Sequence, residues 1–183
     1  RKSSKARLYI TQSSGEYTVS FSVNLAACFI LRDAVICNTT KGQKARIYGG
    51  KTMNAKTERQ IENMKNQTIG VEIEMNHITR ERAARLAADF FGTNRYENTA
   101  GRNGYCTWSA WDAQGREWKF QKDVSIAGCD AEKCELVTPI LKYEDIETLQ
   151  ELVRKLRKAG AISHAGIGAG VHIHIGAKGH TPQ

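Results

Sequence analysis

Proline, long apolar runs and paired cysteines are scarce or missing in this sequence. Two prolines in 183 residues, with 40% hydrophobic and 25% charged residues, describe an ordinary globular chain rather than a collagen-like, repetitive or disordered one. The longest apolar stretch, around residues 25–31, is cut short by Arg32 and Asp33, well below the roughly 20 residues that a membrane helix needs. These absences exclude a membrane span and predict one domain with an extension.

The cysteines form no C-x-x-C pair, and their number is odd: Cys28, Cys37, Cys106, Cys129 and Cys134. No signal peptide precedes them, so a secreted disulfide framework is disfavoured, and we predict reduced, buried thiols in a cytoplasmic protein. The gap between Cys129 and Cys134 is compatible with zinc ligands but not diagnostic of them. The first residue is Arg1 rather than Met, so we expect a fragment of a longer protein.

Common catalytic signatures are also missing. The chain has no G-x-x-x-x-G-K-[ST] loop and no G-x-S-x-G elbow, and its glycine-rich segment at residues 166–170 precedes a strand rather than a helix. Those glycines can still present backbone N–H groups to an anion. Positive charge is in excess, because 27 Lys and Arg against 19 Asp and Glu give a net charge of +8. This balance favours a polyanionic partner or a phosphate-bearing ligand.

The chain divides near residue 67 into two parts of different character. We predict that residues 1–66 are a β-rich accessory region with a helical linker, and we assign them no chemistry. Its hairpin turns at Ser14 and Gly15. The predicted strands of this part cover residues 6–10, 17–24, 26–32, 34–38 and 45–48. The predicted helix covers residues 54–65, with Asn54 as its cap.

Residues 67–183 show clearer periodicity, and we predict that they form the catalytic domain. Strict alternation or turn signals predict strands at residues 68–76, 105–111, 117–121, 135–139 and 171–176. Apolar residues at helical spacing predict helices at residues 79–91 and 143–159. Thr79 is the expected N-cap of the first helix and Gly92 its terminator. The resulting order, β-α-β-β-β-α-β, predicts an α+β fold around a mostly antiparallel sheet.

Two of these strands carry ionisable side chains on one face. Glu72 and Glu74 lie two residues apart and therefore project from the same face, roughly 7 Å apart at the rise of a strand. His172 and His174 are spaced in the same way. Either pair alone is most simply a solvated polar face. Together with Glu135, they form a ligand set that suits Mg²⁺ or Mn²⁺ better than a structural zinc ion.

Six short motifs follow one another over about residues 68–183: GVEIEM, ITRERAARLAADFFGT, DAQGREWKFQKDVSI, CELVTPIL, KYEDIETLQELVRKLRKAGA and GVHIHIGAKGHTPQ. In this order they resemble the putative amidoligase family, which occurs in bacteria, phages and other mobile elements. That family is related to the carboxylate-amine ligases of the glutamine synthetase and glutamate cysteine ligase fold. The resemblance implies a glutamine synthetase-like antiparallel sheet whose concave face carries ATP and metals, with the fold incomplete at the C-terminus.

The activity implied by the resemblance is an ATP-dependent, Mg²⁺-assisted (or Mn²⁺-assisted) ligation. ATP phosphorylates a carboxylate, and an amine attacks the acyl phosphate to form an amide. The implied metal ligands are Glu72, Glu74, Glu135 and His172. The implied catalytic carboxylates are Glu72, Glu74, Asp123 and Glu135. The implied cofactor or substrate contacts are His174, Ser125, Gly168 and Gly170. Substrates would be a carboxylate and an amine, including peptide, protein or cell-wall material, in the bacterial or host cytoplasm.

One departure from the family pattern and two other hypotheses stay open at this point. Val124 stands where the family's Asp-Gly-Ser segment has glycine, so this turn must differ. The charge of +8 and the basic segments 1–7 and 41–46 favour an inactive module of the same fold that binds nucleic acid or a phage structure. A carboxylate-rich metallohydrolase, which would act without ATP, is the third hypothesis.

Overall fold

The computed structural model describes residues 7–13, 16–22, 55–101 and 104–176, and these residues form one antiparallel sheet with helices. The strands are β1 (Arg7–Ser13), β2 (Glu16–Ser22), β3 (Ile69–Met75), β4 (Tyr96–Asn98), β5 (Trp108–Trp111), β6 (Glu117–Gln121), β7 (Cys134–Val137) and β8 (Val171–Gly176). The helices are α2 (Ala55–Lys65), α3 (Arg80–Phe91) and α4 (Ile146–Lys158), with 3-10 turns η3 (Tyr143–Asp145) and η4 (Ala165–Ile167). The predicted α+β class is confirmed.

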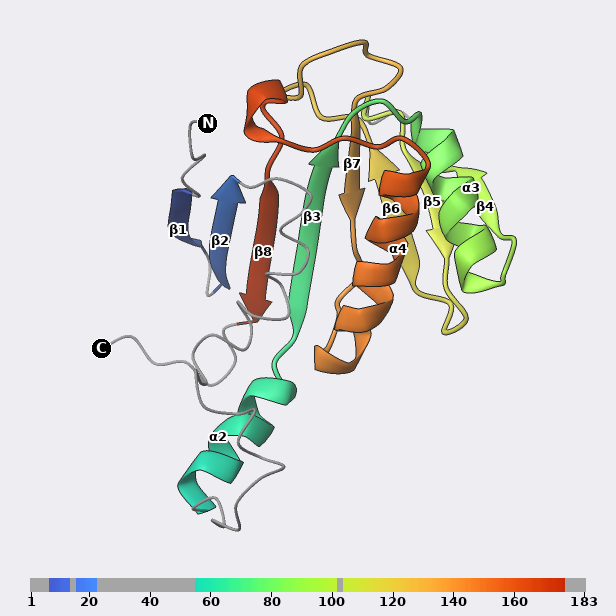
Figure 1. Cartoon of the computed structure of the whole chain (residues 1–183). Helices are drawn as coiled ribbons and strands as arrows, with labels where there is room; N and C mark the ends of the chain where they lie inside the picture. Colours follow the sequence, from blue (N-terminus) through green and yellow to red (C-terminus); the bar gives the residue numbers. More distant parts are fainter. Residues whose placement is uncertain (1–6, 14–15, 23–54, 102–103, 177–183) are drawn as a thin grey trace.

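The strand order places sequence-distant segments side by side (Figure 1). It runs β1-β2-β8-β3-β7-β6-β5-β4, and every neighbouring pair is antiparallel. β3 therefore lies in the middle, between β8 from the end of the described chain and β7. Because the side chains of a strand alternate between the two faces, this order decides which polar residues of β8, β3 and β7 can meet.

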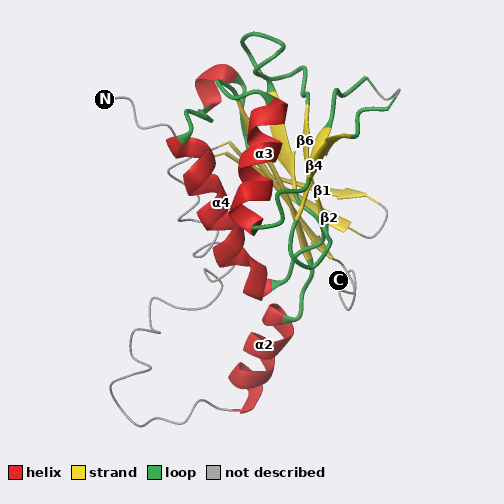
Figure 2. Cartoon of the chain, turned by 90° about the vertical axis from the view of Figure 1, so that its right-hand side faces the viewer, coloured by secondary structure: helices red, strands yellow, loops and turns green. Residues whose placement is uncertain are grey.

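Helices α3 and α4 cover one face of the sheet, and the hydrophobic core lies beneath them (Figure 2). The odd-numbered residues of β3 belong to this core: Val71, Ile73 and Met75 are each 1% exposed, and Ile69 is 6% exposed. α3 lies over β5 and β6 and contributes small buried side chains, Ala83, Ala84, Ala87 and Ala88, whereas α4 contributes large ones, Leu149, Leu152 and Leu156. Small residues let α3 approach the sheet closely. The even-numbered residues of β3 are left for the opposite face.

The ends of α3 follow the sequence prediction. The Thr79 side chain accepts a hydrogen bond from the backbone N–H of Arg82 at 3.2 Å, as an N-cap does. Gly92 ends the helix in the left-handed conformation, with φ of 71°. The helix predicted at residues 143–159 is also present, but its first turn is the tighter η3, and α4 proper begins at Ile146.

Other predictions for the elements need correction or stay outside the description. β4 was not predicted, because three residues are too few to show alternation. The strand predicted from residue 105 begins only at Trp108. The β1–β2 hairpin around residues 14–15 is present, and β2 pairs with β8 in the same sheet. Asn54 and the strands predicted at residues 26–32, 34–38 and 45–48 lie outside the described residues.

A buried ion network joins the β5–β6 turn to the start of α4. The Arg116 guanidinium donates to both carboxylate oxygens of Asp145, at 2.9 and 2.8 Å, and to Asp112 at 2.8 Å. The indole N–H of Trp118 donates to Asp112 as well, at 3.0 Å. The exposed fractions of the two Asp side chains are only 6% and 9%. The network therefore stabilises the sheet against the helical layer.

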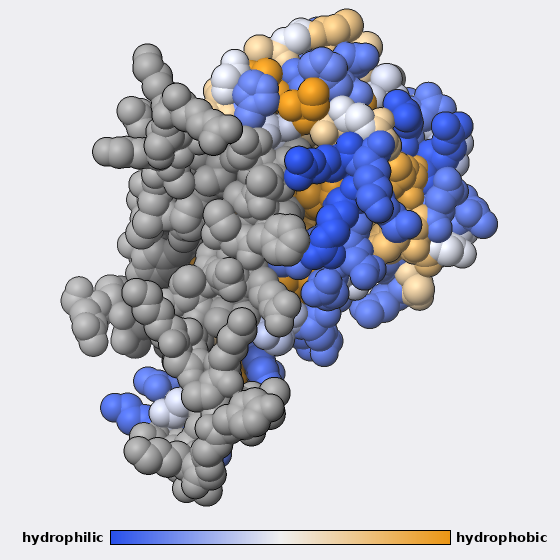
Figure 3. All heavy atoms as spheres, viewed as in Figure 1, coloured by the Kyte–Doolittle hydropathy of each residue, from blue (hydrophilic) through white to orange (hydrophobic). Residues whose placement is uncertain are grey.

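The described surface on the helical side is largely hydrophilic (Figure 3). Charged residues lie on the outer side of α4, including Glu147 and Arg154, whose side chains form an exposed ion pair at 3.3 Å. Among the helices that the structure describes, none combines the length and the apolar character needed to cross a membrane.

Candidate functional site

The sheet register brings the predicted carboxylates and histidines of three strands together. Glu74 of β3 is directly opposite Glu135 of β7, and Glu72 of β3 is directly opposite His172 of β8. The fifth predicted residue, His174, is opposite Gly70. Directly opposite side chains start roughly 5 Å apart. The polar face of the sheet thus brings together Glu74 and Glu135, 61 positions apart in the chain, and Glu72 and His172, 100 positions apart.

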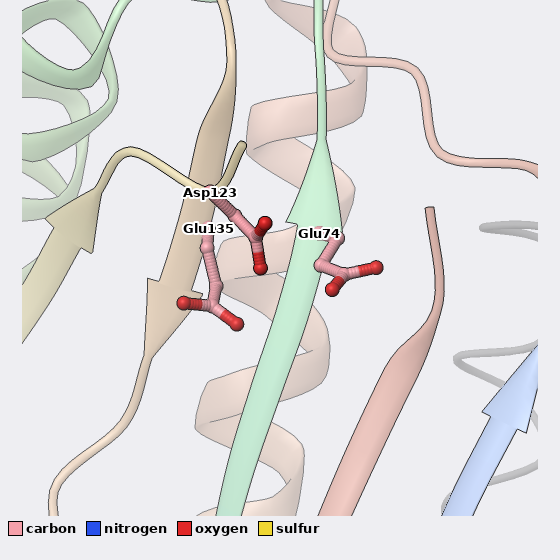
Figure 4. Close-up of side chains that lie close together, drawn as sticks. All are labelled: Glu74, Asp123 and Glu135. Carbon is pink, nitrogen blue, oxygen red and sulfur yellow. The ribbon is translucent and has the colours of Figure 1, made fainter. Parts of the chain in front are cut away.

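A third carboxylate joins Glu74 and Glu135 from a loop (Figure 4). Asp123 follows the end of β6, and one carboxylate oxygen from each of the three residues lies within 4.8 Å of the others. Figure 4 shows the side chains on the side of the sheet turned away from the helix behind it. Glu74 and Glu135 are only 6% exposed. Three acidic groups so close, two of them buried, call for a proton or a cation between them.

The pKa of Glu135 reports this unfavourable environment. Burial raises it to about 7, and the charges of Glu72, Asp123 and Glu74 act in the same direction. The side-chain amide of Gln121 donates a hydrogen bond to Glu135 at 2.8 Å and opposes the shift. A pKa of about 7 means that roughly half of the metal-free molecules carry a proton on Glu135 at neutral pH. A divalent cation would compete with that proton for the carboxylate.

The two histidines of β8 each reach diagonally across to a carboxylate of β3. His172 Nε2 lies 3.5 Å from Glu74 Oε1, and His174 Nε2 lies 3.3 Å from Glu72 Oε1. The hydrogen bond with Glu74 raises the pKa of His172. His172 thus lies beside Glu74 of the carboxylate cluster, as a metal ligand would. His174 lies two residues further along β8, away from the level of Glu135.

The glycine-rich segment closes over the same end of β3. The backbone N–H of Gly170 donates to Glu74 Oε2 at 2.6 Å, and the N–H of Glu74 donates to the carbonyl of Gly170 at 3.1 Å. Gly168 has φ of +74°, and a Cβ placed there would lie 2.9 Å from the carbonyl oxygen of Ser125. Only glycine fits at residue 168 without strain. Two of the predicted glycines therefore contact the carboxylate face or the Asp123 loop.

The turn at Asp123 forms without a glycine. Asp123 Oδ1 accepts a hydrogen bond from the backbone N–H of Ser125 at 2.7 Å, which closes the turn through the side chain. Val124 is 79% exposed. Among the described residues, only His77, Asn94 and Cys106 are non-glycine residues with positive φ. Val124 is thus unstrained, and the turn forms without the glycine that the resemblance leads us to expect there.

The three carboxylates fit a hard divalent cation. Oxygen is the donor that Mg²⁺ and Mn²⁺ prefer, and a soft ion would need thiolate or imidazole groups instead. In the part of the chain that the structure describes, no cysteine joins a group of three candidate ligands. The prediction of buried thiols holds for Cys134, but Cys106 and Cys129 are exposed because they lie in loops. The zinc alternative thus finds no support in the described residues.

Some contacts of this site were not predicted. Gln121, the partner of Glu135, is directly opposite it across β6 and β7. The sequence pattern that could have identified Gln121 is the alternation of Glu117, Lys119 and Gln121, which places all three on one face of a predicted strand. The hydrogen bond between Gly170 and Glu74 has no such local signal, because it joins residues 96 positions apart.

Comparison with known proteins gives one match. A family model described as "putative amidoligase enzyme" matches residues 65–183. This segment includes all the carboxylates, histidines and glycines described above. No curated protein and no solved structure matches the chain.

Proposed function

The chain belongs to the family of putative amidoligase enzymes, and we propose that it is an ATP- and Mg²⁺-dependent ligase that joins a carboxylate to an amine. The observation that carries this proposal is the convergence of Glu74, Asp123 and Glu135 within 4.8 Å on the face of the sheet turned away from α4. We place the catalytic domain at residues 67–183, on a glutamine synthetase-like sheet, and treat residues 1–66 as accessory.

Amide ligation through an acyl phosphate requires a site that screens the negative charge of the transferred phosphoryl group. The γ-phosphoryl group passes to an oxygen of the donor carboxylate and ADP leaves; the amine nitrogen then attacks the carbonyl carbon, loses a proton and displaces phosphate. Mg²⁺ held by the carboxylates would supply charge screening for the phosphoryl oxygens. Without a cation, Glu74, Asp123 and Glu135 would repel a nucleotide, because the site would present like charge to the phosphates.

The residues in and around the cluster can be assigned to the metal ions, the phosphates of ATP and the substrate. Glu74, Asp123 and Glu135 would hold one cation, and Glu72 with His172 are the candidates for holding a second. His174, beside Glu72, would contact the phosphates of ATP. The N–H of Gly170 donates to Glu74 and that of Gly168 to the carbonyl of Ala165, so these two glycines would shape the phosphate end of the site through their backbone course rather than through their own N–H groups. Asp123 and Ser125 would mark the substrate edge, where the exposed turn leaves room for a peptide or protein side chain.

Calorimetric titration of the chain with ATP, in the presence and absence of Mg²⁺, tests the proposal. We expect binding that needs Mg²⁺ and is lost in Glu74→Gln, which keeps the size of the side chain and removes its charge. Glu97→Gln is the matched control, since Glu97 lies on β4 at the edge of the sheet and forms an exposed ion pair with Arg95. Phosphate release that requires both a carboxylate and an amine would then identify the reaction, and Glu72→Ala and His172→Ala should abolish it.

Other outcomes of these measurements would overturn the proposal. If the affinity for ATP is the same with and without Mg²⁺, or the same in Glu74→Gln and wild type, the carboxylate cluster does not take part in nucleotide binding. Affinity for DNA or RNA that falls steeply with salt, without ATP consumption, would favour a binding module instead. Hydrolysis of a substrate with Mg²⁺ alone would point to a metallohydrolase.

A further inference from the structure

The three carboxylates of the cluster are held in two different ways. Glu74 and Glu135 are placed by the sheet, because they are directly opposite residues of the β3–β7 ladder. Asp123 lies outside any strand, on the loop that follows β6 (Figure 4). Its distance from the other two carboxylates therefore depends on whatever fixes that loop. A loop error of about 1 Å is enough to spoil a coordination site.

Asn76 makes the contact that fixes the loop to the sheet. It follows β3 directly, is 5% exposed, and its side-chain amide donates to the carbonyl of Ala127 at 3.1 Å. The other side-chain atom, Oδ1, accepts from His77 Nδ1 at 2.6 Å, which determines the orientation of the amide. The main chain of Asn76 is held by two hydrogen bonds with Ile162, at 2.8 and 3.0 Å. Every polar group of this buried residue is thus used.

The loop is held from its other side by the glycine-rich segment. The backbone N–H of Ala127 donates to the carbonyl of Ile167 at 2.8 Å, and Gly168 lies tightly against the carbonyl of Ser125. At the other end of the segment, the backbone N–H of Gly170 donates a hydrogen bond to the Glu74 carboxylate of β3. These contacts close a ring from β3 to the loop, to the glycine-rich segment and back to β3. Asn76 is the side chain in this ring that reaches the loop from the sheet.

We infer that Asn76 is a positioning residue, which holds the loop of residues 123–128 so that the Asp123 carboxylate meets Glu74 and Glu135. The inference rests on the proposed function in so far as the three carboxylates bind a cation. The described hydrogen bonds of Asn76 go to Ala127, His77 and Ile162 rather than to these carboxylates, so it acts through the backbone of Ala127. It lies on the same face of β3 as Glu72 and Glu74, about 7 Å along the strand from Glu74.

The substitution Asn76→Asp separates positioning from electrostatics. Aspartate keeps the size of the side chain and the acceptor for His77, but it loses the donor to Ala127 and places a carboxylate against a carbonyl oxygen. Electrostatics alone predicts tighter cation binding, because a negative charge is added near the cluster. Positioning predicts weaker binding, by roughly three- to tenfold for one lost hydrogen bond.

Gly128→Ala tests the same contact from the loop. Gly128 has φ of +116°, and a Cβ placed there would lie 3.4 Å from the amide nitrogen of Asn76. This variant leaves Asn76 and the total charge unchanged, so a weaker affinity can come only from the displaced loop. Asn98→Asp is the matched control, since it adds the same charge on β4 and keeps the acceptor for the N–H of Ala100.

Two measurements on the full chain decide the inference. Mn²⁺ titration gives the affinity, and hydrogen exchange of the metal-free protein gives the protection of residues 123–128, with exchange in α4 as the test of global folding. We expect Asn76→Asp and Gly128→Ala to weaken Mn²⁺ binding and to speed exchange of the Ala127 amide roughly tenfold, whereas Asn98→Asp changes neither. Unchanged or tighter Mn²⁺ binding in both variants would overturn the inference.

The failure of the proposed function would look different. If the wild-type chain binds no Mn²⁺, the cation site is wrong, and the exchange measurement alone then decides whether Asn76 holds the loop. Unchanged exchange of residues 123–128 in Asn76→Asp would overturn the positioning role in that case as well.

Discussion

Glu74 and Glu135 are directly opposite each other across β3 and β7, and each is only 6% exposed. Like charges at opposite positions of an antiparallel pair destabilise the sheet. Burial adds to this cost, because water no longer screens the two groups. The pairing thus destabilises the metal-free protein but suits the binding of a cation. Such a trade-off between stability and function is expected at a functional site.

Glu135→Gln should stabilise the metal-free protein at alkaline pH. The folded-state pKa of Glu135, about 7, is above its ordinary value of 4.5, so its stabilising protonated form is fully present below 4.5 and is lost as pH rises through 7. Glutamine mimics that protonated form. We expect a gain of at most about 3 kcal/mol at pH 8 and almost none at pH 4. Urea unfolding in the presence of EDTA measures both values.

The control for this prediction is Glu97→Gln, an exposed glutamate of β4. It should change the free energy of unfolding by less than about 0.5 kcal/mol at either pH. An equal effect of Glu135→Gln at pH 4 and pH 8 would show that the charge of Glu135 is not the cause.

Much of the fold was predictable, because its main elements have strong local periodicity. The strict alternation of Ile69 to Met75 and of Val171 to Gly176 corresponds to β3 and β8, and the apolar spacing after residue 143 corresponds to α4. β4 was not predicted, because it has only three residues and lies at the edge of the sheet, where its pairing with β5 defines it as a strand. Local sequence periodicity is therefore enough to predict the long helices and strands, but not a short strand that exists only through its pairing with a neighbour.

The site was predictable in composition but not in geometry. The alternation placed Glu72 with Glu74 on one face, Glu135 joined them as the carboxylate that opens another predicted strand, and the family resemblance added Asp123. That Glu74 faces Glu135 while Glu72 faces His172 depends on the register between strands, which no local pattern contains. The role we infer for Asn76 was invisible for the same reason, because its partner Ala127 is 51 positions away.

Arg116→Met should destabilise the protein strongly. It would leave the carboxylates of Asp112 and Asp145, whose side chains are 6% and 9% exposed, without their common partner. Breaking a buried pair in this way costs about 3 kcal/mol or more. Arg154→Met is the control, because its ion pair with Glu147 is exposed and contributes less than about 1 kcal/mol. Urea unfolding at pH 7 compares the two variants.

The same network predicts the response to acid. The hydrogen bonds from Arg116 lower the pKa of Asp145 below its ordinary value of 3.8. Its contribution to stability is therefore present above pH 3.8 and is lost as pH falls through the lower folded-state value. Wild type should lose more stability than Arg116→Met between pH 5 and pH 2. Parallel stability curves for the two proteins would contradict this explanation.

Alkylation should distinguish the described cysteines. Burial raises the pKa of Cys134 to about 12, so almost none of it is thiolate at pH 8, whereas Cys106 and Cys129 are exposed. Iodoacetamide should modify the two exposed thiols within minutes and Cys134 only when the protein unfolds. Peptide mapping by mass spectrometry with increasing urea measures each rate. Equal rates for Cys129 and Cys134 in native buffer would show that β7 is not buried as described.

Gly168→Ala should loosen the Asp123 loop as well as strain its own backbone. Alanine at φ of +74° costs about 1 kcal/mol, and its Cβ would lie 2.9 Å from the carbonyl oxygen of Ser125, so the loop must move. Gly115→Ala is a close control, because Gly115 has φ of +76° and a Cβ there would meet nothing within 4 Å. Both variants pay the backbone cost, and the difference between them isolates the contact with Ser125.

We therefore expect Gly168→Ala to lower the free energy of unfolding by about 1–2 kcal/mol more than Gly115→Ala and to weaken Mn²⁺ binding, which Gly115→Ala should leave unchanged. Chemical unfolding and Mn²⁺ titration of the two variants give both comparisons. Equal destabilisation with equal Mn²⁺ affinity would mean that the glycine-rich segment yields freely to the added methyl group. In that case it could not hold the loop, and Asn76 alone would have to keep Asp123 beside Glu74 and Glu135.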